Sequence, residues 1–194
     1  MNFLSFEEYK NNAITINNSK KNVNWIQYEE RWEYHKKAIN FAKELNLEDP
    51  KKVLELGSFG ASIVKDSISM DFNLGWNLDN FKPNYYHDAR KIPWPIEDKQ
   101  FDLFVALRVY QHLYPVQKEA FLEAKRIAKN IIIVVPETYF GGKTGITFDD
   151  FTKWNNNKPP TNYEKIDDIF GYIYYWKGIW SSELHSQLVL HQKK

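Results

Sequence analysis

Short apolar runs separated by polar turns mark several candidate strands along the chain. Val53–Leu56 and Phe101–Leu107 are such runs, and Ile131–Val135 is uniformly apolar and β-branched. Runs of this kind are typical of parallel strands that are buried on both faces of a sheet. Ser67–Phe72 and Asn84–His87 are two further candidate strands, of which the second has the weaker pattern.

The N-terminal region follows a helical pattern instead. Ser5 and Glu8 have the spacing of a capping box, which predicts a short first helix. Residues 11–24 are polar and rich in Asn and Lys, so we expect a loop there. From Trp25 to Asn46, large apolar residues recur at helical spacing with charged residues between them. This segment is therefore predicted to form a long amphipathic helix.

The C-terminal half contains two further helix starts and two late strands. Proline is favoured at the first helical position, so Pro115 predicts a helix whose apolar stripe reaches Ala128. Thr147 has the features of another helix start. Tyr172–Trp176 and Ser186–His191 are predicted to be strands that pair with each other in an antiparallel hairpin.

This alternation of strands and helices predicts an α/β fold with a mostly parallel sheet covered on both faces. Ligands of such sheets bind at the carboxyl ends of the strands. The residues that directly follow the predicted strands are therefore the candidates for a site, namely Glu55–Gly60, Asp71, Asp88 and Leu107–His112.

Composition narrows the possible functions. The 194 residues are enough for one sizeable core, so a single compact domain is expected. The formal net charge of +1 provides no basic field for nucleic acid as the main partner. The absence of cysteine excludes disulfides and thiol nucleophiles, and the five histidines show no metal-ligand spacing.

The sequence also shows no sign of membrane targeting. The N-terminus lacks a basic start followed by an apolar core, and no window approaches the roughly 18 apolar residues of a membrane span. A cytoplasmic protein with no membrane partner is expected.

Four motifs then occur in a characteristic order. They are Glu55-x-Gly57, Asp71, Asp88-Ala89, and the run IPWPIEDKQFDLFVALRVYQHL from Ile92 to Leu113. This order resembles that of class I methyltransferases that use S-adenosylmethionine (SAM), and in particular their small-molecule branch. The resemblance implies a Rossmann-like fold with a seven-stranded, mostly parallel sheet. It also implies a helical lid over residues 1–46 and a methyltransferase-like domain over residues 47–194.

The turn after the first strand departs from the family pattern of acid-x-Gly-x-Gly-x-Gly. Gly57 is kept, but Phe59 replaces the middle glycine and Ala61 the last, and Gly60 is one position out of place. The spacing from Glu55 to Asp71 is 71 − 55 = 16 residues, shorter than the roughly 20 of a usual loop and helix. The helix between them is therefore expected to be cut to a turn or two, or lost. The stretch is either a modified nucleotide loop or only a strand that ends in a turn.

The resemblance implies SAM as cofactor and assigns residues to it. Asp71 would accept hydrogen bonds from both ribose hydroxyls, because a carboxylate has two oxygens. Asp88 would accept from the adenine amino group, and the Ala89 N–H would face a ring nitrogen. Phe72 would lie on the adenine or belong to the core, and Glu55 would act through the loop geometry or on the methionine amino group. The other candidate cofactor residues are Gly57, Ser58, Phe59, Gly60 and Leu107.

The acceptor side of the site is less specified. His112 could act as a general base, or it could merely orient a loop. Arg108 would suit an anionic acceptor such as a phosphate or carboxylate, or it could form a surface salt bridge. Tyr110 and Tyr139 are candidates to line the acceptor pocket.

Other activities fit the residues less well. Methyltransferases of DNA amino groups carry Asn/Asp-Pro-Pro-Tyr after the fourth strand, where this chain reads ALRVYQ. A nicotinamide-binding turn needs Gly-x-Gly-x-x-Gly, which Phe59 breaks. Two functions remain: SAM-dependent transfer to oxygen or nitrogen of a small molecule such as a sugar, and a methyltransferase-like protein that binds without catalysis.

Overall fold

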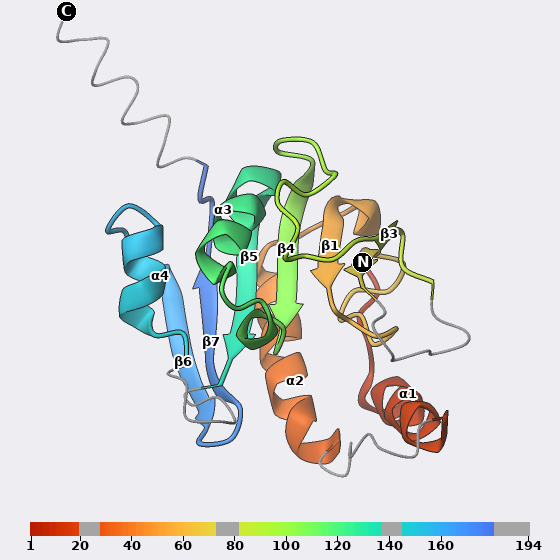
Figure 1. The fold of residues 1–194 in the computed structure, drawn as a ribbon. Helices are drawn as coiled ribbons and strands as arrows, with labels where there is room; N and C mark the ends of the chain where they lie inside the picture. Colours follow the sequence, from red (N-terminus) through yellow and green to blue (C-terminus); the bar gives the residue numbers. More distant parts are fainter. Residues whose placement is uncertain (20–27, 73–81, 137–144, 181–194) are drawn as a thin grey trace, which may run out of the picture.

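The computed structural model describes residues 1–19, 28–72, 82–136 and 145–180. Its centre is a seven-stranded sheet with the order β3-β2-β1-β4-β5-β7-β6 (Figure 1). The strands are β1 (Val53–Leu56), β2 (Ile68–Asp71), β3 (Tyr85–Tyr86), β4 (Phe101–Leu107), β5 (Ala128–Val135), β6 (Asn162–Asp167) and β7 (Gly171–Trp176). This architecture confirms the predicted fold class.

Strand direction creates one edge at which a site can form. Strands β1 to β5 pair in parallel, whereas β7 is antiparallel to both β5 and β6. The carboxyl ends of β1, β4 and β5 therefore meet at the same edge, which is the lower one in Figure 1. The turn between β6 and β7 lies at this edge too, since Tyr172 at the start of β7 pairs with Val135 at the end of β5.

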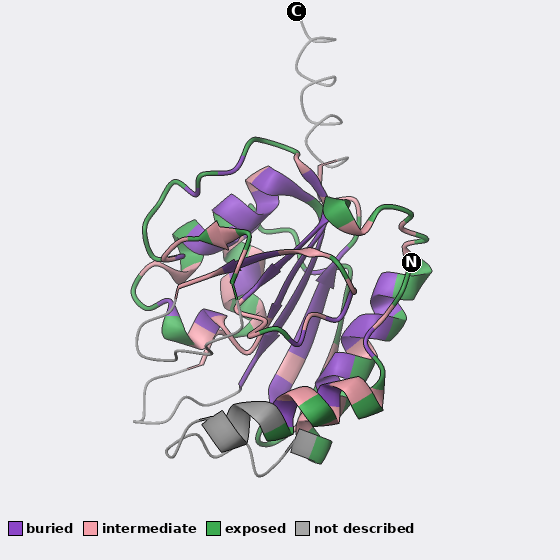
Figure 2. Ribbon diagram, turned by 90° about the vertical axis from the view of Figure 1, so that its right-hand side faces the viewer, coloured by how far each residue is buried: buried purple, intermediate pink, exposed green. Residues whose placement is uncertain are grey.

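Helices cover both faces of the sheet (Figure 2). On one face α3 (Gln117–Ile127) and α4 (Phe148–Trp154) pack on alternate residues of β1, β4 and β5. On the other face α2 (Tyr28–Glu44) buries Tyr34, Ala38 and Ile39 against the remaining residues of those strands. Because α2 supplies half of the sheet's cover, it is a layer of the domain. The division into a lid over residues 1–46 and a methyltransferase-like domain over residues 47–194 stays a prediction.

The N-terminal helix is longer than predicted. Ser5 and Glu8 do form the capping box, with the Glu8 carboxylate accepting from Ser5 N at 2.9 Å and from Ser5 Oγ at 2.7 Å. However, α1 spans Phe6–Ser19 and so takes up much of the segment expected to be a loop. Tyr9 and Ala13 are buried, and this packing explains why a polar segment remains helical. The long helix was predicted to begin at Trp25, which lies outside the described residues.

The late hairpin has different strands from those predicted. The pair is β6 with β7, so Tyr172–Trp176 is a strand as expected, but its described neighbour is the polar segment Asn162–Asp167. The predicted strand Ser186–His191 lies outside the described residues. The helix start at Thr147 is confirmed, because its Oγ1 accepts from Asp150 N at 3.2 Å and the Asp150 carboxylate accepts from Thr147 N at 2.9 Å.

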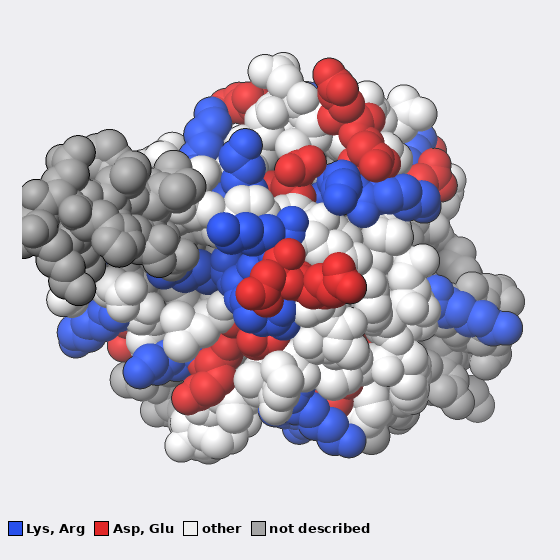
Figure 3. Space-filling view, turned by 90° about the horizontal axis from the view of Figure 1, so that it is seen from above, with Lys and Arg blue, Asp and Glu red and all other residues white. Residues whose placement is uncertain are grey.

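The surface at the opposite edge carries charges of both signs. Viewed from above, Lys and Arg side chains are interspersed with Asp and Glu and with uncharged areas (Figure 3). Within the described ranges, no helix is long and apolar enough to cross a membrane. The same part of the chain contains no group of three or more His, Asp or Glu side chains that could hold a metal ion.

Candidate functional site

The turn after β1 contains three residues with positive φ. Gly57 has φ of 67°, Phe59 of 50° and Gly60 of 78°. A Cβ atom on Gly57 would lie 2.6 Å from Cγ2 of Val109, so the space there accepts only glycine. Between this turn and β2 the chain forms turns and bends without a helix. The expected loss of the helix is confirmed.

Glu55 holds this turn together from inside. Its Oε2 accepts a hydrogen bond from Ile63 N at 2.8 Å, and its Oε1 accepts from Val64 N at 2.9 Å and from Ser67 Oγ at 3.1 Å. The side chain is only 2% exposed, and this burial raises its pKa to about 7 although the three donors act in the opposite direction. Of the two roles considered for Glu55, its contacts fit the one in which it shapes the loop.

The N-terminal segment supports the same turn from outside. Leu4 N donates to Ile63 O at 3.0 Å, and Asn12 Nδ2 in α1 donates to Gly60 O at 3.2 Å. Tyr9 packs in the same hydrophobic cluster as Ile63. The segment thus contacts the loop on the side where a helix following the loop is missing.

Asp71 is the last residue of β2 and lies at the carboxyl edge of the sheet. Its Oδ1 accepts from Phe72 N at 2.8 Å, whereas its Oδ2 is buried and has no hydrogen-bond partner among the described residues. Burial raises the pKa of this carboxyl, and the backbone N–H groups of Phe72 and Phe59 partly oppose that rise. A buried carboxylate oxygen without a donor is costly, and a ligand hydroxyl could satisfy it. The Phe72 ring lies 5.8 Å from that of Tyr86 on β3.

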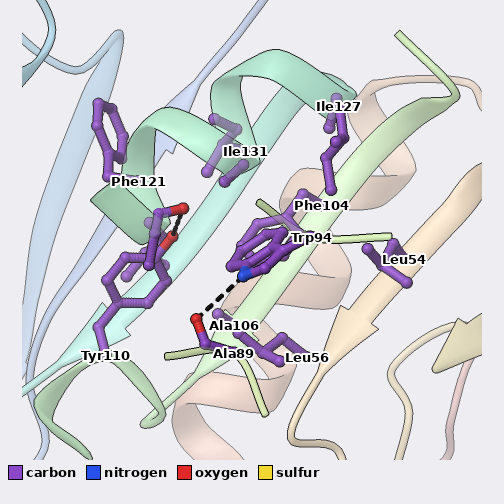
Figure 4. Packing of buried hydrophobic residues seen from close by; sticks show 14 of the residues in the cluster. Leu54, Leu56, Ala89, Trp94, Phe104, Ala106, Tyr110, Phe121, Ile127 and Ile131 are labelled. Carbon is purple, nitrogen blue, oxygen red and sulfur yellow. Dashed lines mark hydrogen bonds between the residues drawn. The ribbon is translucent and has the colours of Figure 1, made fainter. Parts of the chain in front are cut away.

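The segment after β3 is fixed by the IPWP run. Asp88 pairs with Arg90, whose Nη2 lies 2.8 Å from Asp88 Oδ2, and this pairing lowers the pKa of Asp88. Trp94, which is 2% exposed, donates from Nε1 to Ala89 O at 3.0 Å (Figure 4). Its backbone N–H donates to Glu123 Oε2 on α3 at 2.7 Å. The tryptophan therefore positions Ala89 from within the core.

The chain turns sharply after β4. Leu107 ends the strand and packs towards α2, and Arg108 follows with φ of 64°. Arg108 Nη1 donates to Ile169 O in the β6–β7 turn at 2.8 Å, and its guanidinium carbon lies 5.4 Å from the centre of the Phe170 ring. Arg108 thereby joins the end of β4 to the β6–β7 turn.

One predicted acceptor residue, Tyr110, is placed differently from expectation. Tyr110 is fully buried in the core, where its hydroxyl donates to Ala120 O at 3.1 Å (Figure 4). Its predicted role in lining an acceptor pocket is therefore wrong, because the short 3-10 helix that contains it, η2 (Tyr110–His112), turns its ring towards α3. Tyr139 lies outside the described residues.

His112 ends the same short helix at the surface. Its Nε2 lies 3.2 Å from Nε2 of Gln111, and Gln111 Nε2 also donates to the carbonyl of Arg108. Partial desolvation of the ring and the positive charge of Arg108 lower the pKa of His112. Both effects favour the neutral imidazole, which is the form a base requires.

Three residues at this edge were not predicted from the sequence. Arg31 and Tyr34 on α2 meet Phe170 from the β6–β7 turn: the Arg31 guanidinium carbon lies 5.8 Å from the ring centre, and the Tyr34 ring lies 5.3 Å from it. The sequence carries only a weak signal for them, because Arg31 has the pattern of a solvated helix position and Phe170 belongs to a short apolar pair with Ile169 in a turn.

Comparison with known proteins identifies the fold. No protein-family model matches the chain, and no curated protein matches its sequence. Among solved structures, it matches a chain of the Haloferax volcanii complex between the Trm112 methyltransferase activator and a protein described as a methyltransferase. The two share 11% identity over 87% of this chain and 94% of that one, with a TM-score of 0.55. The fold is that of class I SAM-dependent methyltransferases.

Two further matches to this methyltransferase fold cover most of both chains. A protein described as an S-adenosyl-L-methionine-dependent methyltransferase from Methanococcus maripaludis is 16% identical over 91% of this chain and 95% of that one, with a TM-score of 0.51. Magnesium protoporphyrin IX methyltransferase from Synechocystis PCC 6803 with bound SAH is 11% identical over 86% and 91%, with a TM-score of 0.52. At such identities the likeness concerns the methyltransferase fold and not the substrate.

Proposed function

We propose that this protein is a SAM-dependent methyltransferase. The observation that carries the proposal is the buried Oδ2 of Asp71, which lacks a donor among the described residues at the carboxyl end of β2. The positive-φ turn at Gly57 follows the neighbouring strand, and its N–H donates to Met70 O next to Asp71. An acceptor oxygen beside a tight glycine turn, on this fold, suits a ribose and the chain that it carries.

The remaining roles follow from position. Asp71 accepts from the ribose hydroxyls, and Phe72 lies on the adenine. Asp88 retains acceptor capacity beyond its pair with Arg90, since each carboxylate oxygen has two acceptor sites, and it faces the adenine amino group. Bound SAM supplies a methyl group on a positively charged sulfur, which is already activated for displacement. This chain then has to position the acceptor and exclude water.

The acceptor is a small molecule that is methylated on oxygen or nitrogen. His112 lies just after β4, and partial desolvation together with the charge of Arg108 lowers its pKa, so that its neutral form can accept the acceptor proton. The positively charged Arg108 side chain donates to Ile169 O in the β6–β7 turn at the same edge, which supports its role on the acceptor side.

Calorimetric titration with S-adenosylhomocysteine (SAH), with NAD as the control ligand, tests the proposal. We expect micromolar binding of SAH and none of NAD. Asp71→Ala should weaken SAH binding at least about 10-fold, as expected for the loss of hydrogen bonds to a charged group, without loss of folding. Asp149→Ala on α4 is the matched control. An unchanged dissociation constant in Asp71→Ala would refute the ribose assignment. SAH binding without transfer to any acceptor would favour a binding protein of this fold.

A further inference from the structure

Arg108 is held in place without an opposing charge. Its Nη1 is fixed by the Ile169 carbonyl and its flat face by the Phe170 ring, while Nε is buried with no hydrogen-bond partner among the described residues. No described carboxylate lies within ion-pair distance of it. A partly buried guanidinium often has such a partner. The surface salt bridge considered for Arg108 is therefore not formed by the described residues.

A second arginine contacts the same aromatic ring. Arg31 of α2 lies 5.8 Å from the centre of Phe170, and Arg108 lies 5.4 Å from it. Tyr34 packs edge-on to the ring, and Arg31 Nη1 lies 3.5 Å from its hydroxyl oxygen. Three elements that are distant in sequence thus bring two guanidinium groups to the carboxyl edge of the sheet.

The two positively charged guanidinium groups repel each other. Burial lowers the pKa of Arg108, Tyr34 acts in the opposite direction, and the charge of Arg31 lowers it further. Asp167 acts in the opposite direction, but its Oδ1 already accepts from the backbone N–H groups of Ile169 and Phe170. A bound anion would remove the repulsion between the two arginines and would satisfy the buried Nε.

The position of the pair relates it to the acceptor rather than to the ribose. Arg108 follows β4, and the next residue, Val109, is in contact with Gly57 in the turn after β1. Asp71 lies on the other side of β1, at the end of β2. Arg108 therefore lies on the side of the Gly57 turn away from Asp71, and Arg31 contacts the same Phe170 ring as Arg108.

We propose that Arg108 and Arg31 form an oxyanion subsite that binds a carboxylate or phosphate group of the methyl acceptor. The identity of the ligand rests on the proposed function, since the subsite would hold the methyl acceptor. The preference for an oxyanion rests on the arginines themselves, because the planar guanidinium fork matches both a carboxylate and a phosphate.

NMR titration of the full chain tests the subsite directly. Inorganic phosphate and acetate are added separately at constant ionic strength, with and without saturating SAH, and the Nε–Hε signals of the arginines are followed. We expect saturable binding in the millimolar range, with Arg108→Gln and Arg31→Gln each weakening it about 10-fold or more. Lys153→Gln, an exposed cation on α4, is the control and should leave the affinity unchanged. The probe that binds more tightly identifies the oxyanion.

The outcomes separate this inference from the proposed function. Equal affinity in wild type and both arginine variants, or no saturation by either probe, would overturn the subsite even if SAH binds. Anion binding that depends on both arginines in a protein that does not bind SAH would retain the subsite and reject the SAM assignment. If Arg108→Gln does not fold, the anion affinity of Arg31→Gln tests the subsite instead. Arg108→Lys should still bind the anion measurably, because it keeps the positive charge.

Discussion

Gly57 and Val109 are in contact, and a Cβ atom on Gly57 would come within 2.6 Å of Cγ2 of Val109. Gly57 begins the turn after β1, and Val109 follows the end of β4. These strands are neighbours in the sheet, so the contact couples the proposed cofactor turn to the loop that presents Arg108 and His112. Movement of one loop therefore affects the other.

Replacing Gly57 by alanine should cost stability for two separable reasons. The residue has φ of 67°, which disfavours any side chain, and the new methyl group would collide with Val109. Together we expect a loss of roughly 2–4 kcal/mol in the free energy of unfolding. Denaturant unfolding followed by circular dichroism measures it.

The double variant Gly57→Ala/Val109→Ala separates the two contributions. Removing the Val109 methyl groups should relieve the collision but not the backbone strain. Gly57→Ala should therefore lower the free energy of unfolding less in the Val109→Ala background than in the wild type. Equal costs in both backgrounds would mean that the contact contributes nothing.

Glu55 should make stability depend on pH around neutrality. Folding raises its pKa from 4.5 to about 7 because burial penalises the charged form. The folded protein therefore binds this proton more tightly than the unfolded chain does. The resulting stability is fully present below the usual glutamate pKa and is lost as the pH rises through 7. Between about pH 4 and pH 8, we expect a loss of roughly 3 kcal/mol from this group.

Glu55→Gln isolates that contribution, because glutamine does not titrate and the other ionisable groups cancel in the difference. Unfolding free energies of both proteins, measured across the same pH range, should show the wild type losing stability relative to the variant. A difference that stays constant with pH would show that Glu55 keeps an ordinary pKa and that the three donors outweigh its burial.

The sequence was most informative where burial alone determines an element. Val53–Leu56 and Phe101–Leu107 are strands with the predicted bounds, since a short run that is apolar on both faces fits only a covered strand. Asn162–Asp167 escaped prediction because it is an edge strand with polar residues on both faces, so it carries no apolar pattern.

The site was less predictable because it depends on contacts across the chain. Tyr110 was expected in a pocket from its place after β4, but the rotation of a short helix buries it instead. The meeting of Arg108, Arg31 and Phe170 requires the relative placement of three elements, which local spacing does not encode. The position of Asp71 at the carboxyl edge could be predicted because it depends only on the end of one strand.

The hydrogen bond from Trp94 to Ala89 should affect the affinity of the proposed adenine site. Trp94→Phe keeps an aromatic ring in the core but removes the Nε1 donor to Ala89 O. We expect a loss of about 1 kcal/mol in unfolding free energy and a several-fold weaker affinity for SAH, because Ala89 is no longer held. Thermal unfolding and calorimetry measure the two effects.

Trp180→Phe is the matched control, since Trp180 Nε1 likewise donates to a backbone carbonyl, that of Lys125. This residue lies away from the carboxyl edge, so its loss should lower stability by a similar amount and leave SAH affinity unchanged. Equal effects of the two variants on SAH affinity would show that Trp94 acts through general stability and not through Ala89.

The pKa of His112 should report on Arg108. Partial desolvation lowers this pKa, and the nearby positive charge of Arg108 lowers it further, because two cations repel each other. In Arg108→Gln the charge is removed and the desolvation remains, so the pKa should rise yet stay below its usual value. An NMR pH titration of the histidine ring signals measures it, and Lys153→Gln should leave it unchanged. If Arg108→Gln does not move the titration, Arg108 does not set the protonation of His112, and the neutral base that we propose at pH 7 depends on desolvation alone.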